Sequence, residues 1–319
     1  MEDQAVAGSP SRPAGRAVVF AYHNVGVRCL RVLRAHGVDV PLVVTHRDDP
    51  AEVRWFASVR ETAEELRLPW IAPADANAPE VVARVREIAP GFLFSFYFRQ
   101  MLTPSLLALA PCGAYNMHGS LLPKYRGRAP VNWAVLHGER YTGATLHAMT
   151  EKPDAGAIVA QQRVPILPDD TAREVFDKVT VAAEICLDDV LPALLAGTAT
   201  SRPNDRAGGS YFGGRTPEDG RIDWSRPARA IHDLVRAVAP PYPGARTCVG
   251  GVPARILRSR LRDPGTPARA PVLVVDGATL VAYSGGGGCL EVVALEIDGA
   301  PVAAAAFRAR FGDAPVPLG

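Results

Sequence analysis

Residues 17–46, AVVFAYHNVGVRCLRVLRAHGVDVPLVVTH, contain two short apolar runs with a helix-like segment between them. The runs at 17–22 and 40–46 are rich in β-branched residues and lack polar alternation, which is typical of strands that are buried on both faces. In the segment between them, apolar residues recur at helical spacing up to Gly37, and glycine commonly follows the end of a helix. A strand, a helix and a second strand in this order predict the start of a parallel sheet.

The same alternation of amphipathic segments and apolar runs continues beyond residue 46. At the start of the longest amphipathic segment, Thr171 and Glu174 have the spacing of a capping box, and Gly197 follows its end. Repeated alternation of strands and helices predicts an α/β fold with an open, doubly wound, mostly parallel sheet. We expect helices over 52–68, 79–90, 129–139 and 171–195, and strands over 92–98, 113–118, 142–150 and 157–166.

The last third of the chain has a different pattern. Residues 197–214 are rich in Gly, Ser, Thr and Pro, as a linker is. After one further predicted helix at 227–239, the sequence breaks into short apolar runs with frequent turn signals, which is typical of a small β-barrel or sandwich. The expected divisions are a flexible tail at 1–16, an α/β domain at 17–200, a linker at 201–214 and a barrel domain at 215–319.

The composition limits the class of protein. A chain of 319 residues with 48% hydrophobic residues can bury a sizeable core, and its length suggests two domains. The formal net charge of +2 indicates no strongly basic surface, so nucleic acid and membranes are disfavoured as partners. There is no apolar signal segment, no run long enough to span a bilayer, and no CxxC pair among the five cysteines. We therefore expect a cytoplasmic protein with free thiols and no bound metal.

A polar pair ends the predicted strand at 113–118. Asn116 and His118 are two residues apart and therefore project from one face, at the carboxyl end where open α/β sheets form ligand crevices. An amide beside an imidazole can hold the oxygen of a tetrahedral intermediate and transfer a proton. Asp154 lies in a turn between two predicted strands and is the expected partner that orients the imidazole. A purely structural interpretation is that the pair caps the strand and Asp154 forms an Asx turn.

The loop SLLPKYRGRAP at 120–130 carries cations behind this pair. Arg128 suits bidentate contact with a carboxylate or phosphate, whereas Lys124 is equally explained by a solvated loop. The first strand–helix turn has no GxGxxG and the chain has no P-loop motif, which disfavours dinucleotide binding and P-loop ATP hydrolysis. The remaining histidines have no metal-like partners and are interpreted as structural, with the first of them also able to line the crevice: His23, His36, His46, His137, His147 and His232.

Two stretches carry a family resemblance. NMHGSLLPKYRGRAP at 116–130 and DAGAIVAQ at 154–161 resemble the folate-dependent formyltransferases, and the likeness runs from about Ala17 into the C-terminal barrel. Within the family they are most similar to the formyltransferase domain of the bifunctional polymyxin-resistance enzyme. The resemblance implies a Rossmann-like first domain and an OB-like barrel. It also implies formyl transfer from the co-substrate 10-formyltetrahydrofolate to the 4-amine of UDP-4-amino-4-deoxy-L-arabinose, in lipid A modification.

By the same resemblance, Asn116 steadies the oxyanion, His118 transfers the proton, and Asp154 raises the pKa of His118 and fixes its orientation. The turn at 100–102 departs in detail from the family pattern, so its folate contacts are expected to come from the main chain. The residues implied to contact the folate are Gln100, Met101, Leu102, Arg128, Thr150, Glu151, Lys152, Pro153 and Asp154.

Further activities share this fold or these residues. Methionyl-tRNA formyltransferases usually carry a basic insertion after the second strand, whereas residues 45–61 here are short and include several acids. The sequence is also compatible with a formyltransferase for another nucleotide-linked amino sugar, a hydrolase that deformylates the folate, or a non-catalytic folate-binding module. The bifunctional relative continues into a dehydrogenase-type domain that these 319 residues do not contain, so a separate decarboxylase or dehydrogenase is an expected partner.

Overall fold

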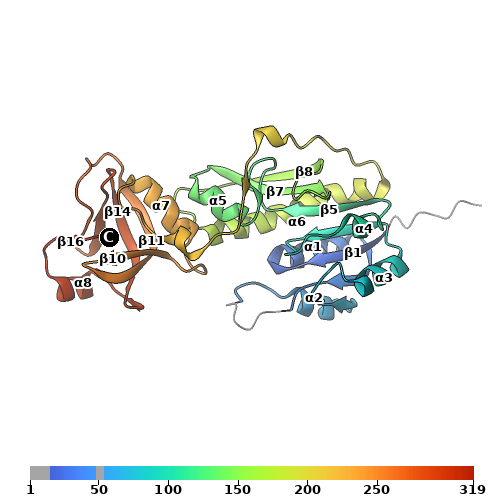
Figure 1. Ribbon diagram of the computed structural model, residues 1–319, viewed down its shortest axis with the longest axis horizontal. Coiled ribbons are helices and arrows are strands. Elements are labelled where there is room, and N and C mark those ends of the chain that lie inside the picture. The colour runs from blue at the N-terminus through green and yellow to red at the C-terminus, as the bar shows by residue number, and fades with distance from the viewer. Residues whose placement is uncertain (1–14, 48–53) are drawn as a thin grey trace, which may run out of the picture. The chain divides into compact units, whose positions relative to one another are not determined.

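The computed structural model describes residues 15–47 and 54–319 (Figure 1). The expected tail therefore lies outside the described residues up to residue 14, as do residues 52 and 53 of the helix expected over 52–68. The chain forms two compact units that alternate along the sequence. The first contains the residues up to Pro123, Ala144–Gln162 and Thr180–Gly208; the second contains Lys124–Gly143, Arg163–Val179 and Gly209–Gly319. The domain limits expected at 17–200 and 215–319 stay a prediction.

A seven-stranded sheet forms from β1 Arg16–Ala21, β2 Asp39–Val44, β3 Trp70–Ile71, β4 Phe92–Phe96, β5 Gly113–His118, β7 Tyr141–Ala148 and β8 Ile158–Pro165. Its strand order is β3-β2-β1-β4-β5-β7-β8. Neighbouring strands from β3 through to β5 are parallel, whereas β5 and β7 are antiparallel. The predicted doubly wound, mostly parallel sheet is thus confirmed. Because β1 lies between β2 and β4, the strand order reverses there, and ligands bind such sheets at the carboxyl ends of the strands.

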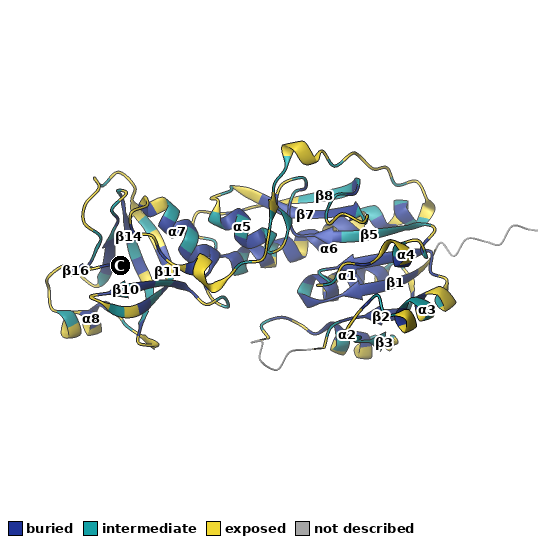
Figure 2. Cartoon of the chain, viewed as in Figure 1, coloured by how far each residue is buried: buried dark blue, intermediate teal, exposed yellow. Residues whose placement is uncertain are grey.

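Helices cover both faces of this sheet: α1 His23–Ala35, α2 Val59–Glu65, α3 Pro79–Ile88, α4 Pro104–Leu107 and α6 Ala172–Ala196. On one face, apolar side chains of β1, β2 and β4 form a buried cluster that includes Val85 of α3 and Leu106 of α4. On the other face α1 meets α6, where Arg28 Nε lies 3.1 Å from Glu184 Oε2. The central strands are almost wholly buried (Figure 2), which explains their continuous apolar sequences.

Two helix starts are set by side-chain caps. Thr171 and Glu174 form the predicted capping box: the Thr171 N–H donates to Glu174 Oε2 at 2.7 Å, and the Glu174 N–H donates to Thr171 Oγ1 at 3.3 Å. In the described part of the helix expected over 52–68, the helix begins after Ser58, whose hydroxyl accepts from the Glu61 N–H at 3.3 Å. Before Ser58, Trp55 and Phe56 instead pack their rings against His23, with ring centroids 4.5 and 4.0 Å from that of His23.

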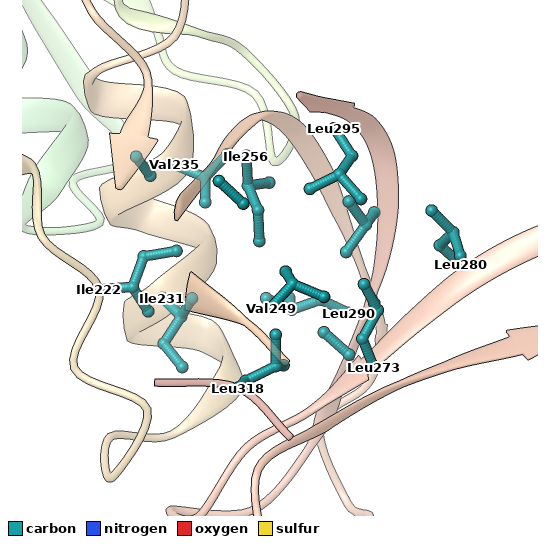
Figure 3. Packing of buried hydrophobic residues seen from close by; sticks show 14 of the residues in the cluster. Ile222, Ile231, Val235, Val249, Ile256, Leu273, Leu280, Leu290, Leu295 and Leu318 are labelled. Atoms are coloured by element: carbon teal, nitrogen blue, oxygen red, sulfur yellow. The ribbon is translucent and has the colours of Figure 1, made fainter. Parts of the chain in front are cut away.

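The second unit contains an antiparallel barrel of β10 Ala245–Val249, β11 Val252–Asp263, β12 Val272–Asp276, β13 Thr279–Tyr283, β14 Cys289–Ile297, β15 Ala300–Pro301 and β16 Val316–Pro317. Cys248 and Gly319 exchange backbone hydrogen bonds of 2.6 and 3.0 Å, which join β10 to the chain end and nearly close the barrel. The interior is apolar (Figure 3), with Ile256, Leu273 and Leu290 packed together. The predicted barrel is confirmed; α7 Ala228–Ala237 and α8 Ala304–Phe311 also contribute to its core.

The second unit also holds most of the loop that follows β5, from Lys124 on, with β6 Arg126–Gly127 and α5 Pro130–Leu136. Much later in the chain it adds β9 Tyr211–Phe212 and η2 Pro217–Gly220, whereas η1 Arg206–Gly208 belongs to the first unit. β6 pairs in parallel with β9. The close approach requires glycine, because a Cβ at Gly127 would lie 2.1 Å from the Phe212 carbonyl oxygen and its φ is +95°. Pairing with a distant segment therefore holds this loop.

The described residues contain no helix that is long and apolar enough to cross a membrane. They also contain no group of three or more His, Cys, Asp or Glu side chains placed to hold a metal ion. The five cysteines carry free thiols, and burial raises the pKa of the Cys29 thiol well above its usual value.

Candidate active site

The register of the neighbouring strands β5 and β7 brings the first polar side chains of the site together. Asn116 of β5 stands directly opposite His147 of β7, and His118 stands opposite Thr145. Because alternate residues of a strand share a face, these four polar side chains project from one face of the β5–β7 pair. The sequence predicted two of them, and the antiparallel pairing adds the other two.

Asp154 completes the cluster from the turn between β7 and β8. Its Oδ1 atom lies 3.4 Å from His118 Nδ1 and 3.4 Å from His147 Nε2, so one carboxylate faces two imidazoles. The Asp154 backbone has φ +48°, a left-handed conformation that an Asp adopts more readily than most residues. Asn204 Nδ2 donates to the Asp154 carbonyl at 3.0 Å and so fixes this turn.

The turn also depends on a glycine. A Cβ at Gly156 would lie 1.9 Å from the Ala148 carbonyl oxygen, so only glycine fits against the end of β7. The neighbouring backbone is paired across the strands, with the Ala148 N–H donating to the Ala157 carbonyl at 2.9 Å. Close packing of the β7–β8 connection therefore sets where Asp154 stands.

The chain directly after His118 is held by buried hydrogen bonds. The Thr145 hydroxyl donates to the Ser120 carbonyl at 2.6 Å and accepts from the Leu122 N–H at 3.2 Å. Gln161 Nε2 donates to Thr145 Oγ1 at 2.8 Å and to the Leu122 carbonyl at 2.9 Å. Residues 119–122 are thus fixed at the edge of the site, with Thr145 as the central group.

Three residues are expected in the folate-binding turn, and the side chains of two of them, Gln100 and Leu102, contact other parts of the protein. Gln100 donates from Nε2 to the Ala74 carbonyl at 2.8 Å and accepts from the Ala76 N–H at 2.7 Å. Leu102 is buried in the core cluster on one face of the sheet. The Met101 side chain is exposed, and its carbonyl accepts from Asn77 Nδ2 at 2.9 Å.

The other expected folate residues lie in two places. Thr150, Glu151, Lys152 and Pro153 form an exposed turn before Asp154, in which the Thr150 hydroxyl donates to the Lys152 carbonyl at 3.0 Å. Arg128 belongs to the second unit, where its N–H donates to the Phe212 carbonyl at 2.9 Å and its side chain is exposed. Lys124, in the same loop, forms an ion pair with Glu139 at 3.0 Å.

His46 supports the turn that follows β4. Its Nε2 atom accepts from the Arg99 N–H at 3.0 Å, and its ring stacks on Phe98 with centroids 4.1 Å apart. Burial and the nearby Arg99 guanidinium lower the pKa of His46 to about 4. The imidazole is therefore neutral near neutral pH, as the hydrogen bond from Arg99 requires.

A hollow of about 340 Å³ lies at the carboxyl ends of β2 and β3. Arg60 stands at one side of it, with its guanidinium carbon 6.0 Å from the centroid of the Trp70 ring. A cationic and aromatic lining of this kind suits an anionic group that carries a ring. The residues that line the hollow are His46, Arg47, Arg60, Trp70 and Ala72.

Sequence reasoning missed His147 as a member of the site. The alternation in β7 places Thr145 and His147 on one face, which the sequence alone could have indicated. It could not indicate that this face joins that of Asn116 and His118, because register between strands depends on which strands become neighbours.

The comparisons with known proteins agree with this architecture. The family description "Formyl transferase" matches residues 20–191, and "Formyl transferase, C-terminal domain" matches residues 215–311. Among solved structures, the chain is similar to WlaRD, a sugar 3N-formyl transferase studied in the presence of dTDP and 5-N-formyl-THF. The identity is 18% over 86% of this chain and 96% of that chain, with a TM-score of 0.68.

Two further structures share the fold. One is an N-formyltransferase from Helicobacter canadensis in complex with folinic acid and dTDP-3-aminofucose, at 18% identity over 87% of this chain and 98% of that chain, with a TM-score of 0.67. The other is HypX from Aquifex aeolicus in complex with tetrahydrofolic acid, at 16% identity over 93% of this chain but 47% of that chain, with a TM-score of 0.61. Since the first family match alone spans more than half of the residues, the chain belongs to the formyl transferase family, and the prediction of a formyl-transferring enzyme is confirmed.

Proposed function

We propose that this enzyme transfers the formyl group of 10-formyltetrahydrofolate to the 4-amine of UDP-4-amino-4-deoxy-L-arabinose. The main support for formyl transfer is that Asn116, His118 and Asp154 lie together at the carboxyl end of β5. The chain also belongs to the formyl transferase family. Similar structures that hold dTDP and dTDP-3-aminofucose support a nucleotide-linked amino sugar as acceptor. The likeness of NMHGSLLPKYRGRAP to the polymyxin-resistance enzyme favours the uridine sugar and the lipid A pathway.

Each residue has a role that its position allows. The neutral amine attacks the formyl carbon, a carbon–nitrogen bond forms, and the carbonyl electrons move onto oxygen. Asn116 Nδ2 donates a hydrogen bond to that oxyanion. His118 accepts the proton released by the attacking nitrogen and delivers it to N10 of the folate, whose bond to the formyl carbon breaks. Asp154, 3.4 Å from His118 Nδ1, holds the imidazole and stabilises its protonated form.

The folate is proposed to lie against the turn at 100–102 and the segment at 150–154. Similar structures that hold 5-N-formyl-THF, folinic acid or tetrahydrofolic acid support a folate co-substrate. Because the Gln100 and Leu102 side chains are engaged within the protein, contacts from this turn come from its main chain and from Met101. Arg128 supplies a cation for the folate carboxylates or for the acceptor.

The acceptor is proposed to be made by a separate enzyme in the cytoplasm. UDP-4-amino-4-deoxy-L-arabinose is a pentose derivative, and loss of the carboxyl group of a six-carbon sugar acid is proposed to supply its five-carbon skeleton. That decarboxylation requires a dehydrogenase-type activity, which is proposed to reside in another polypeptide.

A turnover assay with purified protein tests the proposal. Wild-type protein is supplied with 10-formyltetrahydrofolate and, in separate arms, UDP-4-amino-4-deoxy-L-arabinose, dTDP-3-aminofucose, initiator methionyl-tRNA or no acceptor. Formylation in the first arm supports the proposed substrate. Release of tetrahydrofolate without an acceptor identifies a hydrolase, and activity in the tRNA arm alone identifies the tRNA enzyme. Activity with the dTDP sugar alone keeps formyl transfer and rejects the uridine sugar.

A further inference from the structure

His147 lies inside the active site, but the chemistry above gives it no part. It is 2% exposed, and it stands opposite Asn116 across the antiparallel β5–β7 pair. Among the described residues, the Asn116 side chain has one hydrogen-bond partner, and that partner is His147, with Asn116 Nδ2 3.1 Å from His147 Nε2. A buried polar side chain against the oxyanion donor can act on the reaction through that donor.

The hydrogen bond made by Nδ1 of His147 shows which ring nitrogen carries the hydrogen. Nδ1 lies 2.9 Å from the Ala148 carbonyl oxygen, which can only accept, so Nδ1 carries a hydrogen. In the neutral imidazole the other nitrogen, Nε2, then holds a lone pair. This lone pair accepts from the Asn116 amide nitrogen, the donor that faces it.

This hydrogen bond decides which way the Asn116 amide is turned. Rotation of the amide by half a turn would bring its oxygen against the Nε2 lone pair, and two acceptors in contact repel. The amide nitrogen therefore stays toward His147 and has one further hydrogen to donate. An oxyanion donor acts best when its orientation is fixed before the reaction.

Two titratable side chains of the described residues, Asp154 and His118, lie close to His147. Asp154 Oδ1 lies 3.4 Å from His147 Nε2, and the His118 ring lies with its centroid 6.4 Å from that of His147. Protonation of Nε2 would direct a hydrogen toward the Asp154 carboxylate and remove the acceptor that Asn116 uses. The carboxylate would then be shared between two imidazoles, and His118 would lose part of its partner.

We infer that His147 is a positioning residue: as a neutral acceptor it turns the Asn116 amide so that an N–H meets the formyl oxygen. This inference rests on the proposed formyl transfer. His147 touches neither co-substrate in this role, so its loss lowers kcat and leaves the KM values nearly unchanged. His147→Phe keeps a planar aromatic side chain, slightly larger than imidazole, and removes the acceptor together with the Nδ1–H that donates to Ala148. His147→Gln instead places an amide oxygen where Nε2 stood.

The first experiment is a double-mutant cycle on kcat. His147→Phe lowers kcat by about 10- to 100-fold, less than the loss of the oxyanion donor itself, and His147→Gln recovers most of it. In an Asn116→Ala background, His147→Phe costs no further rate, because residues that act through one another are not additive. Equal losses in both backgrounds, or no loss in the single variant, overturn the inference.

A matched control lies on the same strand. Thr142 is 2% exposed, and among the described residues its hydroxyl has no hydrogen-bond partner. Thr142→Val therefore alters a buried position of β7 without removing a bond, and kcat stays unchanged. A loss in Thr142→Val equal to that in His147→Phe shows that any change in β7 disturbs the site, and the inference fails.

A second readout is independent of turnover. Nitrogen NMR of histidine-labelled, full-length protein at neutral pH shows the neutral tautomer of His147 with its hydrogen on Nδ1. A His147 signal with both nitrogens protonated overturns the inference. If the wild-type protein formylates none of the acceptors, the proposed function fails, whereas this spectrum still decides whether His147 is the acceptor for Asn116.

Discussion

The Nδ1 atom of His118 and the Oδ1 atom of Asp154 lie 3.4 Å apart, and both side chains are nearly enclosed, at 7% and 11% exposed. Another His–Asp pair is more exposed: His36 Nε2 lies 2.7 Å from Asp188 Oδ1, with side chains 26% and 58% exposed. This more exposed pair links the residue that follows α1 to α6. Loss of the carboxylate can therefore be compared in a buried pair beside Asn116 and in an exposed pair of the same type, with kcat as the measured quantity.

Asp154→Asn keeps the size of the side chain and removes its charge, so the imidazolium form of His118 loses its stabilisation. We expect kcat to fall by about 10²–10⁴, the range for general acid–base groups. Steady-state kinetics measures this, with Asp188→Asn as the control that leaves kcat unchanged. A rate near that of the wild type for Asp154→Asn would show that His118 does not need the carboxylate.

Asn116→Ala removes the amide that faces the formyl oxygen. Loss of one oxyanion donor typically lowers kcat by about 10²–10³, and the KM for the folate changes little because the donor acts in the transition state. Single-turnover formylation, with folate binding measured separately, checks both parts. Equal loss of binding and rate would instead make Asn116 a ligand contact.

Gly156→Ala inserts a methyl group where the Ala148 carbonyl oxygen would be 1.9 Å away. The turn must move, and we expect a loss of about 1–3 kcal/mol in the free energy of unfolding together with a lower kcat, because Asp154 moves with the turn. Urea unfolding measures the stability. Gly213→Ala is the control, since a Cβ there meets nothing within 4 Å, and it leaves both quantities unchanged.

The stability of the fold depends on pH through His46. Its pKa is lowered from 6.5 to about 4 in the folded protein, first by burial and then by Arg99. Between these values the unfolded chain binds the proton more readily, so the free energy of unfolding falls as the pH drops from 6.5 toward 4. In His46→Gln this contribution is absent, and urea unfolding at several pH values shows a shallower decline. Parallel curves for the two proteins would contradict the role of His46.

The second unit contains a buried ion pair in α7. Arg236 Nη2 lies 2.8 Å from Asp233 Oδ1, with side chains 6% and 7% exposed, and Arg236 Nη1 donates to the Asp170 carbonyl at 3.1 Å. Asp233→Ala leaves a buried guanidinium without its counter-charge, which costs about 3–5 kcal/mol. The double variant with Arg236→Met removes both charges and recovers part of the loss. Thermal unfolding checks that the single variant is less stable than the double variant, and that both are less stable than the wild type.

The sequence determined the local parts of this protein because local parts depend on neighbouring residues. Continuous apolar runs predicted β1 and β4, and the Thr171–Glu174 spacing predicted the start of α6. The spacing of Asn116 and His118 placed both on one face of a strand, since alternation along a strand is fixed by the backbone. Ser58, which starts α2, was overlooked, although its spacing to Glu61 is the same kind of local signal.

Only the tertiary structure decided what surrounds that pair. The pairing of β7 beside β5 brings His147 against Asn116, and packing at Gly156 brings Asp154 within 3.4 Å of two imidazoles. The loop after β5 is likewise held by β9, a segment far away in the chain. Such contacts depend on which distant segments become neighbours and in which register, and no local pattern of residues specifies either.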